Sequence, residues 1–481
     1  MPGRQLPGIF ITKHFLPPKF LQVKILKLFI FFPLLISCSC SDSNSSTPVV
    51  PTPTPTPALT DEQLLDKVQQ DALKYFWEYA EPNSKLARER YHTDDPSLDA
   101  NLVTTGGSGF GLMTILVGIE RGFVPREEAV NRLSTALTFL ENADRFHGAW
   151  SHWINGTNGH VVPFGTVDNG GDLVETSFLC QALICVREYF KNGSTAEQAL
   201  AQKADLLWKG VDWSWYTKGG ENALYWHWSP EYEWQLNFKL EGYNECLITY
   251  IMAASSPTHP VGAAAYNQGW ARSGAIVHAG NSYGLPVIFN YNGATGGVGP
   301  MFWSHYSYLG LDPTGLTDQY ANYEQLTDNH AKIIYNFCQA NPIGWTGYSE
   351  KCWGLTASYS RNANGSTGYS AHAPNNDKGI ISPTAALSSF PYTPTESMRM
   401  LRFLYEEQAA TLVGIAGPYD AFSPHFNWVT PRYLAIDQGT IVPMIENHRT
   451  GMLWDLFMGA PEVKAGLLTL GFSSSRHSLA P

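Results

Sequence analysis

Apolar residues recur at helical spacing in one segment after another of this chain, and long loops separate the segments. The first segment follows residues 60–63, which resemble a capping box, and its apolar positions are Leu64, Leu65, Val68, Ala72, Leu73 and Phe76. The same periodicity predicts eleven further helices, at 109–121, 125–143, 172–191, 194–209, 242–255, 260–271, 322–340, 383–389, 395–408, 440–457 and 462–470. The pattern therefore indicates an all-α domain of about twelve helices.

The loops between these helices are rich in Gly, Pro, Trp and His. The longest span residues 144–166, 213–239, 281–318 and 348–378, and loops of this length usually carry function in a compact domain. Strands and helices do not alternate, which argues against a doubly wound sheet. We expect one domain over residues 58–481 with the architecture of an (α/α)6 barrel, whose loops form a cleft at one mouth. An irregular helical bundle is the alternative, and short strands can lie within the loops.

The N-terminus is typical of an exported protein. Lysines between residues 13 and 27 precede a short apolar run at 28–37, which is too short to span a membrane and ends at Cys38. Residues 35–38 resemble a bacterial lipobox, so we expect a signal peptide at 1–37 and lipidation of Cys38. An ordinary signal peptide with a chance cysteine is the alternative. Residues 38–57, rich in Ser, Thr and Pro, are the expected tether.

Composition limits the partners. The net charge is −11 and no basic run occurs in the body of the chain, so a nucleic-acid partner is not expected. We predict a monomer that contacts the membrane only through its lipid anchor, in the periplasm or on the cell surface at the outer membrane.

Cysteine and acidic residues give no metal pattern. Five cysteines lie outside the export region, an odd number that favours buried thiols over a disulfide framework: Cys180, Cys185, Cys246, Cys338 and Cys352. No CxxC or HExxH spacing occurs, and Asp94, Asp95 and Asp99 do not have the spacing of a calcium loop. We therefore predict no metal and no cofactor.

Three carboxylates lie close together in residues 165–176. Asp168, Asp172 and Glu175 are spaced by four and three residues, which places them on one face of a helix, where like charges are destabilising. Glycosidases use such carboxylates in pairs, one as an acid and one as a base or nucleophile. The chain also has 15 Trp, 24 Tyr and 24 Phe against only 15% charged residues, as suits a cleft in which rings stack on sugars. The alternatives are an aromatic core and, for Asp172, a helix N-cap.

Two more acidic motifs occur downstream. Glu245 lies in the sequence GYNECLITY at 242–250, where the dipole of a predicted helix is a sufficient structural reason for it. Asp437 and Glu446 lie in residues 436–451, where Asp437 can cap a helix that begins near Gly439 and Arg449 can pair with Glu446. The glycine-rich runs 106–109 and 296–299 do not follow strands and are interpreted as turns at the mouth of the barrel.

Residues 169–177, 242–250, 254–260, 436–441 and 445–451 resemble the glycoamylase-like family of Bacteroidetes lipoproteins. The resemblance implies an (α/α)6 fold, with the glycoamylase-like region at about 235–470. It implies an inverting glycoside hydrolase that cleaves β-1,2-glucan, although the family name suggests a glucoamylase-type α-glucosidase and fold does not determine substrate. A glycan-binding protein without activity and a polysaccharide lyase are the other classes. Loops poor in Lys and Arg argue against the lyase.

The resemblance also implies roles for single residues. Glu245 falls at the position of a proposed catalytic glutamate and is the expected acid, and Asp168, Asp172, Glu175 and Asp437 are the candidates for the base. The expected sugar-binding residues lie beside Glu245 and in the aromatic loops: Tyr243, Asn244, Trp226, Trp228, Trp303 and His305. Inversion requires an acid and a base about 6.5–9.5 Å apart.

Overall fold

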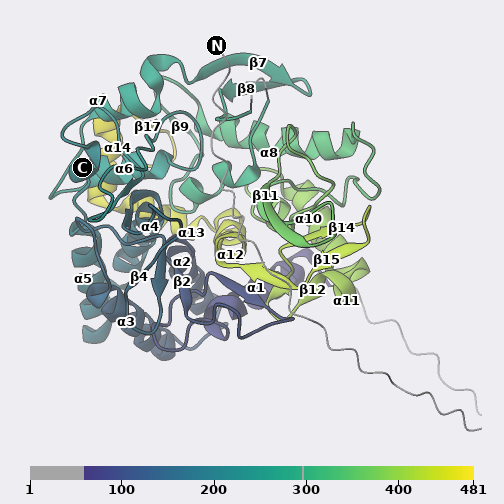
Figure 1. The fold of residues 1–481 in the computed structure, drawn as a ribbon, viewed down its shortest axis with the longest axis horizontal. Helices are drawn as coiled ribbons and strands as arrows, with labels where there is room; N and C mark the ends of the chain where they lie inside the picture. Colours follow the sequence, from purple (N-terminus) through teal and green to yellow (C-terminus); the bar gives the residue numbers. More distant parts are fainter. Residues whose placement is uncertain (1–58, 295–296, 481) are drawn as a thin grey trace, which may run out of the picture. The chain divides into compact units, whose positions relative to one another are not determined.

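The computed structural model describes residues 59–294 and 297–480. The predicted signal peptide, the lipidation site Cys38 and the tether lie outside the described residues. The chain divides into two units, Met1–Thr60 and Asp61–Pro481, and the second is a mostly helical body with one extensive buried core (Figure 1). Within the described ranges, no helix is long and apolar enough to cross a bilayer.

Several helices are buried on almost every side. They are α2 (Thr105–Glu120), α4 (Leu173–Phe190), α6 (Leu247–Ser255), α9 (Pro383–Leu387) and α12 (Ala435–Arg449). Helix α2, TGGSGFGLMTILVGIE, carries no charge before its last residue, and a helix that is apolar all round must be buried. Helix α4 packs between α2 and α6, and α12 packs on α2 and α9. A short helical segment, Tyr306–Tyr308, contacts α6.

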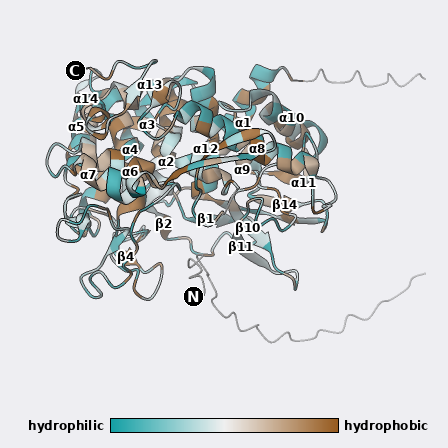
Figure 2. Cartoon of the chain, turned by 90° about the horizontal axis from the view of Figure 1, so that it is seen from above, coloured by the Kyte–Doolittle hydropathy of each residue, from teal (hydrophilic) through white to brown (hydrophobic). Residues whose placement is uncertain are grey.

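A second set of helices is amphipathic and covers the first. These are α1 (Asp61–Trp77), α3 (Arg126–Asn142), α5 (Thr195–Lys209), α8 (Tyr323–Ala340), α10 (Pro394–Arg402) and α14 (Pro461–Leu470). Each packs its apolar face on a buried neighbour: α1 on α12, α3 on α2, α5 on α4, α10 on α9, α14 on α6, and α8 on Met301–Ser304. Figure 2 shows the mixed polar and apolar colouring of these outer helices.

Most predicted helices are confirmed within a few residues, with three corrections. The segment predicted at 440–457 is two helices, α12 and α13 (Met452–Gly459), because Gly451 has a positive φ of 77° that ends the first one. The segment at 260–271 is α7 (Ala263–Ala265) followed by a π-helical turn, and the one at 395–408 is α10 followed by a second π-helical turn before α11 (Ala409–Leu412). Residues 106–109, predicted as a turn, lie in the first turns of α2.

Short antiparallel strands lie in the loops, as the sequence allowed. The central three-stranded sheet is β2 (Leu102–Thr104), β3 (Trp153–Asn155) and β4 (Val161–Val162). The two-stranded pairs are β1 (Arg90–His92) with β16 (Arg432–Leu434), β5 (Gly171–Asp172) with β6 (His227–Trp228), β7 (Val277–Ser282) with β8 (Leu285–Phe289), β9 (Leu316–Thr317) with β17 (Ser473–Ser474), β10 (Ala357–Arg361) with β11 (Thr367–Ala371), β12 (Val413–Gly414) with β13 (Gly417–Pro418), and β14 (Ala421–Ser423) with β15 (Trp428–Thr430). In the view of Figure 2, β1, β2, β4, β10 and β11 gather on one side of the helical layer.

The strands lead directly into the buried helices. Strand β2 ends at Thr104 and α2 begins at Thr105, β5 runs into α4, and β16 runs into α12.

The five cysteines predicted as buried thiols are free and buried, which confirms that prediction.

Candidate active site

The N-terminal ends of the buried helices carry the predicted carboxylates. Glu175 lies in the first turn of α4, Asp437 lies in the first turn of α12, and Glu245 precedes α6 by two residues. The structure therefore corrects the expectation that Glu245 lies within a helix and that Asp437 caps one, because Leu434 is the N-cap of α12. Helix N-termini carry partial positive charge, so their convergence favours negative groups at this end of the helices.

Asp172 is the most completely hydrogen-bonded of these carboxylates. As the N-cap of α4 it accepts the backbone N–H groups of Val174 and Glu175 on Oδ1. Its Oδ2 accepts from Trp226 Nε1 at 2.9 Å and lies 2.9 Å from His152 Nδ1. With both oxygens engaged and no exposed surface, Asp172 fixes the positions of Trp226 and His152. The capping role foreseen for Asp172 is confirmed.

Glu175 is buried beside the start of α2. The backbone N–H of Gly106 donates to Glu175 Oε2 at 2.7 Å. Burial raises the pKa of Glu175 to about 7, although the nearby His152 and the Gly106 N–H favour the ionised form. A Cβ at position 106 would lie 2.6 Å from Oε2, so only glycine allows this approach. The glycine-rich run of α2 thus makes room for a carboxylate.

His152 supplies the positive charge of the cluster. Burial opposes its protonation, but Glu175 and Asp172 more than offset this effect and raise the pKa of His152 to about 10. His152 lies outside the acidic motifs of the sequence. Only its contact with Asp172 across the fold distinguishes it from the other histidines.

Asp168 lies in the loop before β5, at the edge of the cluster. Burial, and then the charge of Asp172, raise its pKa to about 6. Asp168 Oδ1 lies 3.5 Å from His227 Nε2. That nitrogen accepts the backbone N–H of Gly170 at 3.0 Å, and burial lowers the pKa of His227. His227 is therefore neutral with a hydrogen-bond acceptor directed at Gly170, and it does not form an ion pair with Asp168.

Glu245 faces the carboxylates at the start of α4. Burial raises its pKa to about 7, its own backbone N–H acts in the opposite direction, and the charges of Glu175 and Asp172 raise it further. A carboxyl group with this pKa is half protonated near neutral pH, as a general acid needs to be. Burial, and then the charges of nearby groups that include Asp437, Glu245 and Glu175, raise the pKa of the Tyr306 hydroxyl.

Asp437 is 3% exposed and accepts the Tyr306 hydroxyl on Oδ1 at 3.4 Å. Its second neighbour is Asp420, a buried residue between β13 and β14 that sequence reasoning missed. Burial and the adjacent Asp420 hold the pKa of Asp437 well above its usual value.

Two further groups border the cluster and were also missed. Glu89, just before β1, interacts with Glu175, His152 and Asp437. Tyr369 on β11 is 38% exposed, and its hydroxyl interacts with Asp437, Asp420, Glu89 and Glu245. Both residues lie in strand segments without a motif, so no local sequence signal points to them.

Among the predicted sugar-binding residues, the tryptophans are partly exposed. Trp226 stacks on Phe238, which is 39% exposed, with ring centroids 5.2 Å apart. Trp228 contacts Trp215, which is 38% exposed, and Trp303 stacks on Tyr291 at 6.0 Å. Partly exposed rings that are held in place by aromatic neighbours are suited to stack on sugars.

The polar residues expected to bind sugar are placed differently. Tyr243 is fully buried and its hydroxyl contacts Ser304 Oγ, while His305 is 1% exposed and its Nε2 contacts Ser389 Oγ. Asn244 is 8% exposed and its side-chain oxygen accepts the Cys246 N–H. The polar atoms of Tyr243 and His305 are therefore engaged inside the protein rather than exposed to a sugar.

Glu446, expected to pair with Arg449, has a different partner. Arg121 Nε and Nη2 bind its two carboxylate oxygens at 2.8 and 2.9 Å, and Gln69 and Thr450 donate to it as well. Arg449 instead pairs with Glu62 and Asp66 of α1. Glu446 therefore has the structural role that the sequence suggested. Its ion pair with Arg121 joins α12 to the end of α2.

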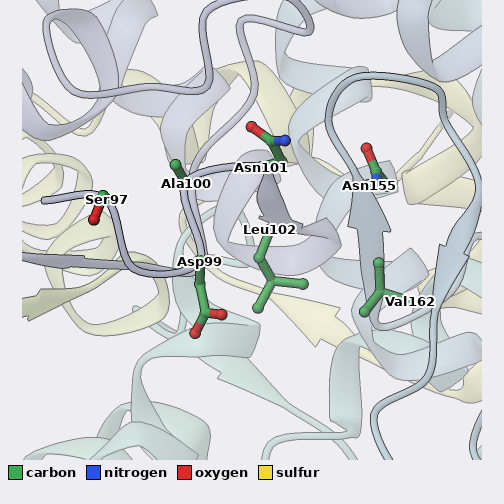
Figure 3. Close-up of a pocket in the computed structure, with 7 residues that line it drawn as sticks. All are labelled: Ser97, Asp99, Ala100, Asn101, Leu102, Asn155 and Val162. Carbon is green, nitrogen blue, oxygen red and sulfur yellow. The ribbon is translucent and has the colours of Figure 1, made fainter.

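A hollow on the molecule's surface lies apart from these carboxylates. It is formed by segment 97–102 and the strands that carry Asn155 and Val162 (Figure 3). None of the carboxylates of the predicted site lines it. Its one charged residue, Asp99, lies 3.5 Å from Arg90 Nε. Across the described ranges, no group of three or more His, Cys, Asp or Glu side chains is arranged to hold a metal ion.

The chain is similar to proteins of one family over most of its length. Residues 237–461 match the family model Glycoamylase, described as "Putative glucoamylase". The structure of an endo-β-1,2-glucanase from Chitinophaga pinensis, in complex with sophorotriose and glucose, is 55% identical with a TM-score of 0.84, and the match covers 87% of this chain and 99% of that chain. The chain belongs to the glycoamylase family. The resemblance found in the sequence is thereby confirmed.

A second relative of this glycoamylase-family chain is an exo-β-1,2-glucooligosaccharide sophorohydrolase (non-reducing end) from Parabacteroides distasonis. It is 45% identical over 429 residues, which is 85% of this chain. The chain spans 58% of the length of that relative. The family match at 237–461 includes Glu245 and Asp437, whereas the cluster at 168–175 precedes it.

Proposed function

We propose that this glycoamylase-family protein is a glycoside hydrolase that cleaves β-1,2-glucan with inversion at the anomeric carbon. The observation that carries the proposal is the pair Glu245 and Glu175. Glu175 is buried in the first turn of α4, Glu245 is partly exposed just before α6, and each has its pKa raised to about 7. An acid–base mechanism requires carboxyl groups that are partly protonated near neutral pH. Similarity to two enzymes named for β-1,2-glucans supports the substrate class.

In this proposal Glu245 is the general acid. Its carboxyl proton passes to the glycosidic oxygen as the bond to the anomeric carbon breaks. A water molecule attacks that carbon from the opposite side and gives its proton to a second carboxylate. Asp172 already holds four hydrogen-bond partners, so we assign it a positioning role for His152 and Trp226. Asp437, Glu175 and Asp168 remain candidates for the base.

The proposal also includes the arrangement of the helices in two rings. We assign α12, α2, α4, α6, the segment Met301–Tyr308 and α9 to the inner ring of an (α/α)6 barrel, with α1, α3, α5, α14, α8 and α10 outside. The sequence of packing contacts supports this assignment, and it explains why the residues of the cluster lie at the N-terminal ends of inner helices. We also propose that the protein is a monomer, held at the outer membrane by a lipid on Cys38.

Release of reducing sugar tests the substrate. Linear β-1,2-glucan and soluble starch are incubated with equal amounts of the purified protein, and with Glu245→Gln as a matched control. We expect reducing ends to appear from the β-1,2-glucan alone, and only with the unaltered protein. Release from starch alone would replace the proposal with an α-glucosidase. Tight binding of β-1,2-glucan without any release would replace it with a glycan-binding protein.

A further inference from the structure

Two buried carboxylate oxygens lack a hydrogen-bond donor. Asp420 is 5% exposed and Asp437 is 3% exposed. One oxygen of Asp420 accepts the backbone N–H of Tyr359 at 2.7 Å, and one oxygen of Asp437 accepts the Tyr306 hydroxyl. The other two, Asp420 Oδ1 and Asp437 Oδ2, receive no N–H or O–H group from the described residues. Buried polar atoms without partners are rare in folded proteins and ask for an explanation.

Asp420 and Asp437 are neighbours in the electrostatics of the site: after burial, the adjacent Asp420 is the main cause of the raised pKa of Asp437. If both were ionised, like charges would repel each other in a buried site, and neither group could donate to an unpartnered oxygen of the other. One proton between them satisfies both unpartnered oxygens and leaves a single negative charge.

We propose that Asp420 and Asp437 share one proton and act as a single acid–base unit, with Asp420 as the positioning residue that sets the protonation of Asp437. The proposal rests on the proposed function and names the base within it. The unit carries one negative charge before reaction. When water attacks the anomeric carbon, its proton passes to the unit, which becomes neutral, while Glu245 loses its proton to the leaving oxygen. The unit then releases one proton to solvent, and Glu245 regains one.

The surroundings of the pair fit this role. The groups that face Asp437 are Glu89 before β1, Tyr306 after α6 and Tyr369 on β11. Tyr359 on β10 faces Asp420, and the Tyr359 hydroxyl contacts His92 Nε2 at 2.6 Å. Arg432 lies over the Tyr359 ring, 5.9 Å from its centroid. Burial raises the pKa of Asp420 to about 6, which suits a proton acceptor at neutral pH.

The test is a double-variant cycle on the full chain. Thermal unfolding is measured between pH 5 and pH 8 for the unaltered protein, Asp420→Asn, Asp437→Asn and the double variant, with the exposed Asp455→Asn as the control. If the folded protein keeps the shared proton, its stability is greatest below about pH 4 and falls as pH rises, because the unfolded carboxyls ionise near pH 4. We expect each single variant to abolish the same part of the fall in Tm with rising pH. The double variant should abolish no more of this fall than either single variant does. The control should follow the unaltered protein.

If the two single variants change the slope of Tm against pH and their effects add in the double variant, the carboxyl groups are independent and the proposal is overturned. No change in this slope in any of the variants would also overturn it. A second measurement needs no variant: carbon-13 NMR of protein labelled at the aspartate γ-carbons. We expect one protonated aspartate signal to persist at pH 8, and its absence would also overturn the proposal.

Activity then tests the catalytic part. We expect Asp420→Asn to lower kcat at least about tenfold with little change in KM, and to move the acidic limb of the pH profile to lower pH. Unchanged kcat and an unchanged acidic limb would remove the pair from the mechanism. If the unaltered protein does not cleave β-1,2-glucan at all, the proposed function fails, and the thermal and NMR results still decide whether the proton is shared.

Discussion

At the scale of single residues, the carboxylates of the cluster differ in the donors that each receives. Asp172 has four partners and is held for structure, whereas the partly exposed Glu245 receives no side-chain donor from the described residues. Burial without donors favours the protonated form, and burial with donors favours the ionised form. Differences in burial and in donors therefore give the carboxyl groups of the cluster different tendencies to hold a proton.

The first prediction concerns Glu245. We expect Glu245→Gln to keep the fold and to lower kcat roughly 10²- to 10⁴-fold, the usual contribution of a general acid. In the unaltered protein, kcat/KM should fall above pH about 7, because the acid loses its proton there. Initial rates on β-1,2-glucan across pH check both results. A variant within a few-fold of the unaltered protein would exclude Glu245 as the acid.

The same substitution predicts a change in stability. The folded pKa of Glu245 is raised from 4.5 to about 7, so its contribution to stability is fully present below about pH 4.5 and is lost as pH rises through 7. Glu245→Gln removes this loss, and its Tm should exceed that of the unaltered protein at pH 8 but not at pH 4. Equal Tm values at both pH values would show that Glu245 is not desolvated in solution.

At the scale of elements, the start of α2 shapes the site. We expect Gly106→Ala to displace Glu175, because the added methyl group would lie 2.6 Å from Oε2 and 2.9 Å from a ring carbon of Phe178. Activity should fall at least about tenfold and stability by about 1–3 kcal/mol, the usual effect of overpacking. Gly459→Ala is the matched control, since nothing lies within 4 Å of its added atom. Normal activity in Gly106→Ala would show that Glu175 need not contact α2.

The ion pair between α2 and α12 carries a stability prediction. Burial disfavours the charge of Glu446, but hydrogen bonds from Arg121, Thr450 and Gln69 outweigh it and hold its pKa below the usual value. Glu446→Gln should lower the free energy of unfolding by about 3 kcal/mol, as for other broken buried pairs. Urea unfolding measures the loss, with the exposed Glu127→Gln as control. A loss no larger than that of the control would show that the pair is not stabilising.

The helices could be predicted from sequence, whereas much of the site could not. Periodicity located α1, α3, α5 and α8 closely, because amphipathic faces leave a direct signal in the sequence. The end of α12 at Gly451 was missed, since an apolar pattern continues across it. The dense motif at 168–175 pointed to the cluster. Glu89, His152 and Asp420 lie outside this motif. They join the cluster only through contacts between loops that are distant in the sequence.

At the scale of the whole molecule, the predicted anchor is tested in cells. Cys38→Ala removes the acyl acceptor, and a single apolar run then has no stable hold on a membrane. We expect the protein to leave the membrane fraction and appear in the soluble one. Unchanged fractionation of Cys38→Ala would exclude lipidation at this residue.

The anomeric form of the first product tests the central proposal most directly. Proton NMR follows linear β-1,2-glucan from the moment the unaltered protein is added, before mutarotation mixes the anomers. We predict that the α-anomer of the new reducing end appears first and then equilibrates, because inversion of a β-linkage gives an α-product. Initial appearance of the β-anomer, or no cleavage of β-1,2-glucan by the folded protein, would contradict the account.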